Sequence, residues 1–99
     1  MDAVSRLEAL REAYPDQAEL ELVVGKLLDV ALRRYRQRLE HYEDELRQFE
    51  QRYGLDSDVF YQRFEAGELG DATDYFEWAS LYELRQDLLL KVERLEATL

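Results

Sequence analysis

The amino-acid sequence contains no cysteine, one proline, four glycines and one histidine among its 99 residues. Without cysteine the chain forms neither disulfide bonds nor thiolate metal sites, and its composition leaves the redox compartment open. No apolar run approaches the roughly 20 residues that a membrane-spanning helix needs. Residues 1–14 are amphipathic and charged throughout, unlike the apolar core of a signal peptide. These absences predict a cytoplasmic protein that has no contact with a membrane.

Positive charge is also scarce, because 13 Lys and Arg residues stand against 23 Asp and Glu residues and the formal net charge is −10. General binding of nucleic acid needs a basic surface, since affinity for phosphates depends on Lys and Arg. We therefore expect no direct contact with nucleic acid, and the acidity fits a basic protein partner. One basic cluster could grip RNA, but its acidic neighbours favour an ion-paired helix face. It consists of Arg33, Arg34, Arg36 and Arg38.

The residues that are abundant, Leu, Glu, Arg and Ala, are good helix formers. No alternating pattern of apolar and polar residues indicates a strand. We therefore predict an all-α fold in a single domain of residues 1–99, which is too short for a second core. The expected architecture is an antiparallel hairpin of two long helices with a short connecting helix and a short N-terminal helix. The four expected helices cover residues 2–14, 16–53, 57–66 and 72–98.

Single residues mark the ends of these helices. Pro15 closes the first helix and can begin the second, because proline lacks the N–H that a helix interior needs. Gly54 and Gly67 are expected to stop the second and third helices, and Asp71 is expected to cap the fourth. Gly25 lies inside the second helix, where either a slight weakening of the helix or a close contact with another helix would explain it.

The two long helices carry more apolar surface than an antiparallel pair can bury. Between Leu20 and Leu32 the apolar arc of the second helix widens, and the last helix has two apolar faces. We expect the face with Trp78 and Leu89 to pack on the second helix and the other face to stay outside. The N-terminal helix can cover only part of the excess, so we expect a protein partner or a homodimer. The candidate partner-binding residues of this apolar set are Val23, Leu27, Val30, Leu81, Leu84, Leu88, Val92 and Leu95.

Catalytic signatures are weak, and we expect no enzymatic activity. His41 and Glu45 lie one helical turn apart and could form a catalytic dyad, but a solvated surface pair explains them more simply. The serines Ser5, Ser57 and Ser80 lack the glycine-framed elbow or the base that activation requires. No cofactor is implied.

A run of acids from Glu65 to Glu77 suggests a magnesium site, because its members recur every three residues. Gly67 and Gly70 break the helix inside this run, so the acids cannot share one helix face. Capping and solvation explain them more simply, and we predict no metal site. The acids of the run are Glu65, Glu68, Asp71, Asp74 and Glu77.

Nine of the twelve aromatic residues fall between Phe49 and Tyr82, together with three of the four glycines. Their helical spacing favours a packed core over a ligand site. The core prediction covers Phe60, Phe64, Phe76, Trp78 and Tyr82. The polar tips of Tyr61 and Tyr75 beside acidic residues suit a partner interface.

One group of known proteins shares features with this stretch. Tyr53-Gly54, the pair Phe60 and Phe64, the run Gly67-Glu68-Leu69-Gly70-Asp71 and the run Tyr75-Phe76-Glu77-Trp78 resemble small helical proteins that are encoded beside TumE-type toxins. The likeness covers about a third of the chain, and Ala72-Thr73 stands where further acid is expected. The resemblance implies the antitoxin of a type II toxin–antitoxin pair, with a cognate toxin as partner.

Two hypotheses follow. The first is a non-enzymatic binding module that neutralises a toxin by occlusion, with residues 56–77 facing a basic, RNA-handling surface. The alternative is a homo-oligomeric helical scaffold protein, a dimer of hairpins with no toxin partner. The candidate acidic and aromatic partner-binding residues are Asp58, Tyr61, Glu65, Glu68, Asp74 and Tyr75.

Overall fold

The computed structural model describes residues 2–14 and 16–99, and this part of the chain is all-α, as predicted. The helices are α1 (Ala3–Ala13), α2 (Gln17–Tyr53), α3 (Ser57–Glu65) and α4 (Thr73–Ala97). Each differs from its expected range by at most one residue at either end. The expected role of Pro15 lies outside the described residues.

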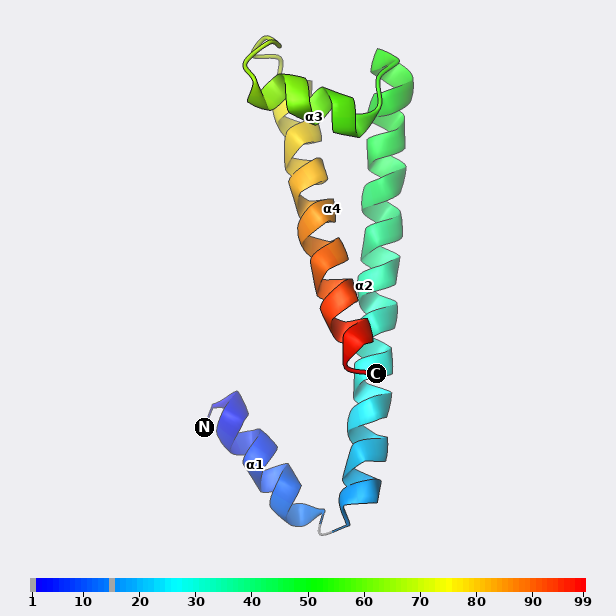
Figure 1. The fold of residues 1–99 in the computed structure, drawn as a ribbon, viewed down its shortest axis with the longest axis vertical. Helices are drawn as coiled ribbons and strands as arrows, with labels where there is room; N and C mark the ends of the chain where they lie inside the picture. The colour runs from blue at the N-terminus through cyan, green and yellow to red at the C-terminus, as the bar shows by residue number, and fades with distance from the viewer. Residues whose placement is uncertain (1, 15) are drawn as a thin grey trace.

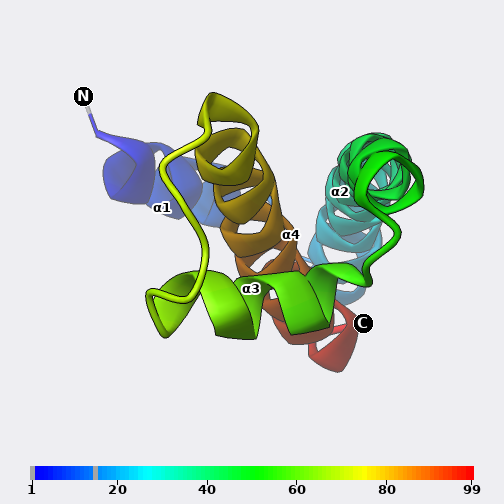
Figure 2. The ribbon, with the colours of Figure 1, turned by 90° about the horizontal axis from the view of Figure 1, so that it is seen from above.

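The molecule is elongated, with extents of 59 × 25 × 18 Å and a radius of gyration of 19.5 Å. Helices α2 and α4 lie side by side in opposite directions, and α3 crosses their ends (Figures 1 and 2). We call this the closed end. Near its C-terminus α4 meets Arg36, which pairs with Glu96 at 2.6 Å. Residues 17–31 of α2 extend beyond α4, and α1 diverges from them (Figure 1). We call α1 and residues 17–31 the free end.

A stack of aromatic rings forms the core of the closed end. Trp78 and Phe60 are fully buried, and their rings lie 3.8 Å apart at an interplanar angle of 3°. Phe49 of α2 stacks on Trp78 at 5.6 Å, and the buried Leu46 joins the same cluster. The indole Nε1 donates a hydrogen bond of 2.9 Å to the hydroxyl of Ser57, so the one polar atom of the ring is satisfied. Three helices therefore meet around one side chain.

The turns that flank α3 follow the glycines. Gly54 and Gly67 have φ angles of 63° and 72°, the left-handed geometry that glycine adopts without strain. The N-terminus of α3 is capped by a side chain of another helix, because the N–H of Ser57 donates to Glu50 Oε2 of α2 at 2.8 Å. The prediction that Asp71 caps α4 is wrong. The backbone stays extended through Ala72, so this residue, and not Asp71, is the N-cap, and no side-chain hydrogen bond caps the helix.

The expected division of the two faces of α4 is confirmed for Trp78, which packs on Phe49 and Tyr53 of α2, but it is wrong further along the helix. Leu88 and Val92 are 3% and 9% exposed within the single chain, whereas Leu89 is largely exposed. Only α2 was expected to pack on α4, whereas both α2 and α3 do so. Helix α3 packs on the aromatic face of α4, where Phe60 meets Trp78. Beyond the reach of α3, the face with Leu88 and Val92 is the one that packs against α2.

We predict that Phe60→Ala lowers the free energy of unfolding by about 3–5 kcal/mol, because it removes a fully buried ring and leaves a cavity beside Trp78. Denaturant titration followed by tryptophan fluorescence measures the change. The control is Val59→Ala, an exposed neighbour on α3, with an expected change within about 0.5 kcal/mol. Equal losses for the two variants would contradict the assignment of the ring stack as the core.

Candidate functional site

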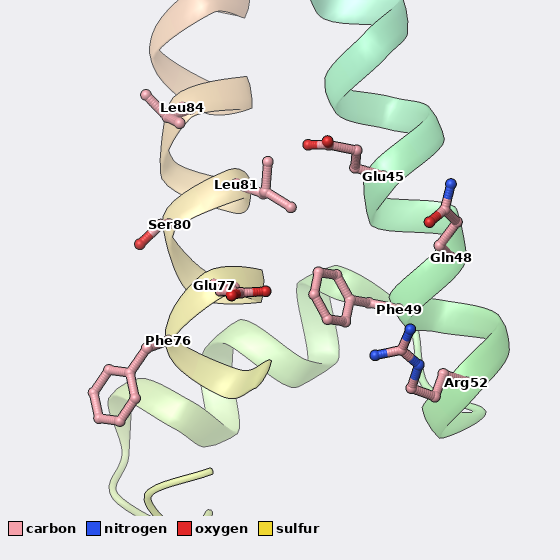
Figure 3. Close-up of a pocket in the computed structure, with 9 residues that line it drawn as sticks. All are labelled: Glu45, Gln48, Phe49, Arg52, Phe76, Glu77, Ser80, Leu81 and Leu84. Carbon is pink, nitrogen blue, oxygen red and sulfur yellow. The ribbon is translucent and has the colours of Figure 1, made fainter. Parts of the chain in front are cut away.

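A groove of about 590 Å³ runs between α2 and α4 near the closed end. Figure 3 shows Phe49, Arg52 and Glu45 from α2, and Glu77 and Leu81 from α4, directed into the space between the helices. Three side chains, Phe76, Ser80 and Leu84, lie along the outer edge on α4. Phe76 is 52% exposed and Leu84 is 47% exposed, so the rim of the groove carries large apolar side chains in contact with solvent.

The charged side chains in and beside the groove differ in whether they have an ion-pair partner. Arg52 lies 5.5 Å above the ring of Phe49 and pairs with Asp74 at 2.9 Å, so its cation is already engaged. Glu45 faces His41, whose Nε2 lies 3.4 Å from its carboxylate. Among the described residues, no cation lies within ion-pair distance of Glu77. The groove therefore combines an apolar rim with a carboxylate that is free to receive a positive charge.

The chain beside the groove is strongly acidic. Residues 54–77, which we call the acidic connector, contain seven Asp and Glu residues and one Arg. Within the described residues, ion pairs engage two of these acids, Asp58 with Arg85 at 3.5 Å and Asp74 with Arg52. Glu65 and Glu68 are exposed at the tip of the closed end. The connector thus presents net negative charge to solvent on the same end of the molecule as the groove.

Four of the six candidate acidic and aromatic residues hold helices together. The hydroxyl of Tyr61 donates to Glu83 at 2.6 Å, and its ring stacks on Tyr82 at 4.3 Å. This hydrogen bond and partial burial raise the pKa of Tyr61 well above its usual range. Asp58 is bound to Arg85, as described above. These contacts join α3 to α4, so Tyr61 and Asp58 have structural roles.

Asp74 and Tyr75 belong to a second internal network. The hydroxyl of Tyr53 and the guanidinium of Arg52 both donate to Asp74, which lowers the pKa of its carboxyl. The same hydrogen bond raises the pKa of Tyr53. Tyr75 contacts the rings of Tyr53 and Phe60 at 5.6 and 5.8 Å. This network ties the C-terminus of α2 to the first turn of α4.

The candidate apolar residues are divided by the fold. Leu88 and Val92 are buried between α4 and α2, and Leu81 and Leu95 are half-buried. Leu84 lies on the rim of the groove. The remaining three belong to the free end, where Leu27 is 61% exposed, Val30 is exposed and Val23 is half-buried. The structure therefore does not gather the eight residues into one surface.

The free end exposes a second apolar region. Helix α1 has no buried residue, so its aliphatic side chains do not cover α2 as expected. A hollow of about 840 Å³ lies between α1, residues 17–29 of α2 and the C-terminus of α4. Gly25 lies on its wall, and a Cβ there would meet no atom of the described chain within 4 Å. No contact within the chain therefore requires this glycine.

The other sequence candidates gain no chemistry from the fold. The His41 side chain is 70% exposed beside Glu45. Ser57 is buried as the acceptor for Trp78, and Ser80 lies on the rim of the groove. Among residues 2–14 and 16–99, no three side chains of the metal-ligating types come close enough to hold an ion. In the same residues, no helix has both the length and the apolar character to cross a bilayer.

Sequence reasoning missed the groove because it assigned Phe76 to the core with the other aromatic residues. The angular position of Phe76 around its helix could have indicated that this side chain lies apart from the core. At 100° per residue, Phe76 lies roughly 160° from Trp78 around α4. There its ring meets that of Phe64 of α3 at 5.5 Å, and Phe76 remains 52% exposed.

We predict that Glu83→Gln changes the alkaline stability of the fold. The raised pKa of Tyr61 means that its hydrogen bond stabilises the fold fully below pH about 10 and is lost as the pH rises through the folded value. Without the carboxylate this loss is smaller. The unfolding temperature of the unmodified protein should therefore fall more steeply above pH about 10 than that of Glu83→Gln, as measured by circular dichroism. Glu93→Gln, which removes the same charge from the exposed side of α4, should keep the steep fall. Equal slopes for all three proteins would contradict the assignment.

Comparison with known proteins finds no similar family model, curated protein or solved structure for this chain. Inference about its role therefore depends on the chemistry of the groove, the acidic connector and the free end.

Proposed function

We propose that this protein is a non-enzymatic interaction module that binds a basic protein partner at the groove and the acidic connector, as the antitoxin of a toxin–antitoxin pair does. The observation that carries the proposal is the exposed rim of the groove, where Phe76 and Leu84 stand beside the unpaired carboxylate of Glu77. Large aromatic and aliphatic side chains that anchor a contact, with charge beside them, are the usual composition of an interface.

The scaffold of this proposal is the antiparallel hairpin of α2 and α4 with α3 as its cap. The ring stack fixes the closed end, so the groove and the connector are held in one arrangement before a partner arrives. A preformed surface loses less conformational entropy on binding than a flexible one. The rim of the groove then supplies apolar contact, and the connector supplies complementary charge.

The mechanism is occlusion of a basic, RNA-handling surface on the toxin. A basic toxin surface recognises phosphates, and the acidic connector competes for the same groups. The opposite charges accelerate association more than they deepen affinity, so the association rate falls as salt rises. We propose this partner from the resemblance of residues 49–82 to proteins encoded beside TumE-type toxins, and the comparisons with known proteins add no support to it. The proposed location is the cytoplasm, where such a pair acts.

Expression of the neighbouring gene tests this role. If the gene beside this one encodes the toxin, its expression alone should arrest growth, and co-expression with this protein should restore growth and yield a complex that co-purifies. Growth of colonies and affinity purification from the co-expressing strain measure the two outcomes. A harmless neighbour that does not co-purify would refute the antitoxin role.

The groove is tested by Leu84→Glu. The substitution places a carboxylate on the apolar rim, and we expect affinity for the partner to fall about 100-fold, because a new charge is desolvated in the contact. The control is Leu90→Glu on the same helix, where Leu90 is 52% exposed but does not line the groove. Titration calorimetry with the purified partner compares the two variants. Equal affinities would place the binding surface elsewhere.

A further inference from the structure

The free end is an apolar region that the groove proposal leaves unused. Leu22, Val24 and Leu27 of α2 are exposed, as are Val4, Leu7 and Leu10 of α1. Among residues 2–14 and 16–99, no helix packs on residues 17–31 in the way that α4 packs on the rest of α2 (Figure 1). The hollow between α1 and α2 lies along the line that α4 would follow if it continued.

The exposed area of the chain matches what a stable dimer buries. The accessible surface of the chain is 7641 Å², whereas a compact protein of 11.9 kDa exposes about 5,900 Å². The excess is roughly 1,700 Å² per chain. Permanent homodimers bury about 1,000–2,500 Å² on each subunit, so the excess falls within their range.

The exposed aliphatic side chains of the free end favour an apolar partner surface. At 100° per residue, the aliphatic positions from Leu20 to Val30 other than Leu22 fall on an arc of roughly 160°. The charged positions Glu19, Glu21, Lys26 and Asp29 fall outside this arc, and Leu22 lies among them. The hollow beside this arc carries charges of both signs, Arg11 with Glu21 and Asp29, and so does not select a basic or an acidic partner. The complement of the arc is an apolar helical surface of the same length, about 22 Å for residues 17–31. A second copy of the chain presents one.

We propose that the free end is a homodimer interface, in which residues 17–31 and α1 of one copy pack in antiparallel fashion against the same segments of a second copy. The contact is isologous, so each aliphatic side chain meets the equivalent surface of its partner across a two-fold axis. The helices of the second copy fill the hollow. The closed ends then lie at opposite tips of the dimer, and both grooves remain accessible.

Sedimentation equilibrium of the full chain tests the proposal. The expected mass is twice 11.9 kDa across the micromolar range. In the double variant Val24→Glu/Leu27→Glu we expect the dissociation constant of the dimer to rise about 100-fold or more, because two carboxylates enter an apolar contact. Both side chains are exposed in the single chain, so helix content by circular dichroism should be unchanged. The control is Leu84→Glu/Leu90→Glu, which makes the same change on α4 and should leave the dimer intact.

Spin labels locate the contact independently. Because the chain has no cysteine, a label can be placed at one site through Leu22→Cys at the free end or Gln62→Cys on α3. Pulsed dipolar spectroscopy should give a distance well below the 59 Å length of one chain from Leu22→Cys and no measurable distance from Gln62→Cys. A monomeric protein, a dimer that survives Val24→Glu/Leu27→Glu, or a short distance from Gln62→Cys would each overturn the proposal. Its failure leaves the groove proposal standing, since Leu84→Glu tests a separate surface.

Discussion

The stacking of Trp78 on Phe60 and Phe49 is the contact on which the rest of the fold depends. It joins α2, α3 and α4 in one place, and the hydrogen bond to Ser57 allows the indole to be buried without an unsatisfied N–H. At this end α4 packs on both α2 and α3, and further along the hairpin the face with Leu88 is buried against α2. The ring stack therefore decides which aliphatic side chains are hidden and which remain at the surface.

The two ends of the molecule differ as a result. Stabilising contacts are concentrated at the closed end, where buried rings, ion pairs and tyrosine–carboxylate hydrogen bonds occur together. The free end has helices of suitable length, but the described part of the chain offers no element that faces them as α4 faces the rest of α2. Helices of this kind gain most of their stability from packing an apolar face rather than from intrinsic propensity. A second copy at the free end would supply that packing, and the closed end would stay available for a different partner.

The acidic composition serves two purposes in this arrangement. The carboxylates of Asp58, Asp74 and Glu83 bind arginines and tyrosines within the molecule. Glu65, Glu68 and Glu77 face solvent near the groove and give this end its negative field. A count of acids in the sequence cannot separate the two groups, because both occur in the same stretch. The separation depends on which side chains of α2 and α4 come within reach when the chain folds.

The all-α class and the positions of the helices could be predicted from the sequence, because helix propensity, apolar spacing and glycine are local signals. Gly54 and Gly67 end their helices as expected, since only the local backbone is involved. Which side chains are buried, and which side chain caps α3, could not be predicted in this way. The way in which three helices meet buries Leu88 and leaves Phe76 exposed. It also brings Glu50, rather than a neighbouring side chain, to the N-terminus of α3. The groove and the free end are products of that packing, because a helix face is only exposed or buried relative to a neighbour.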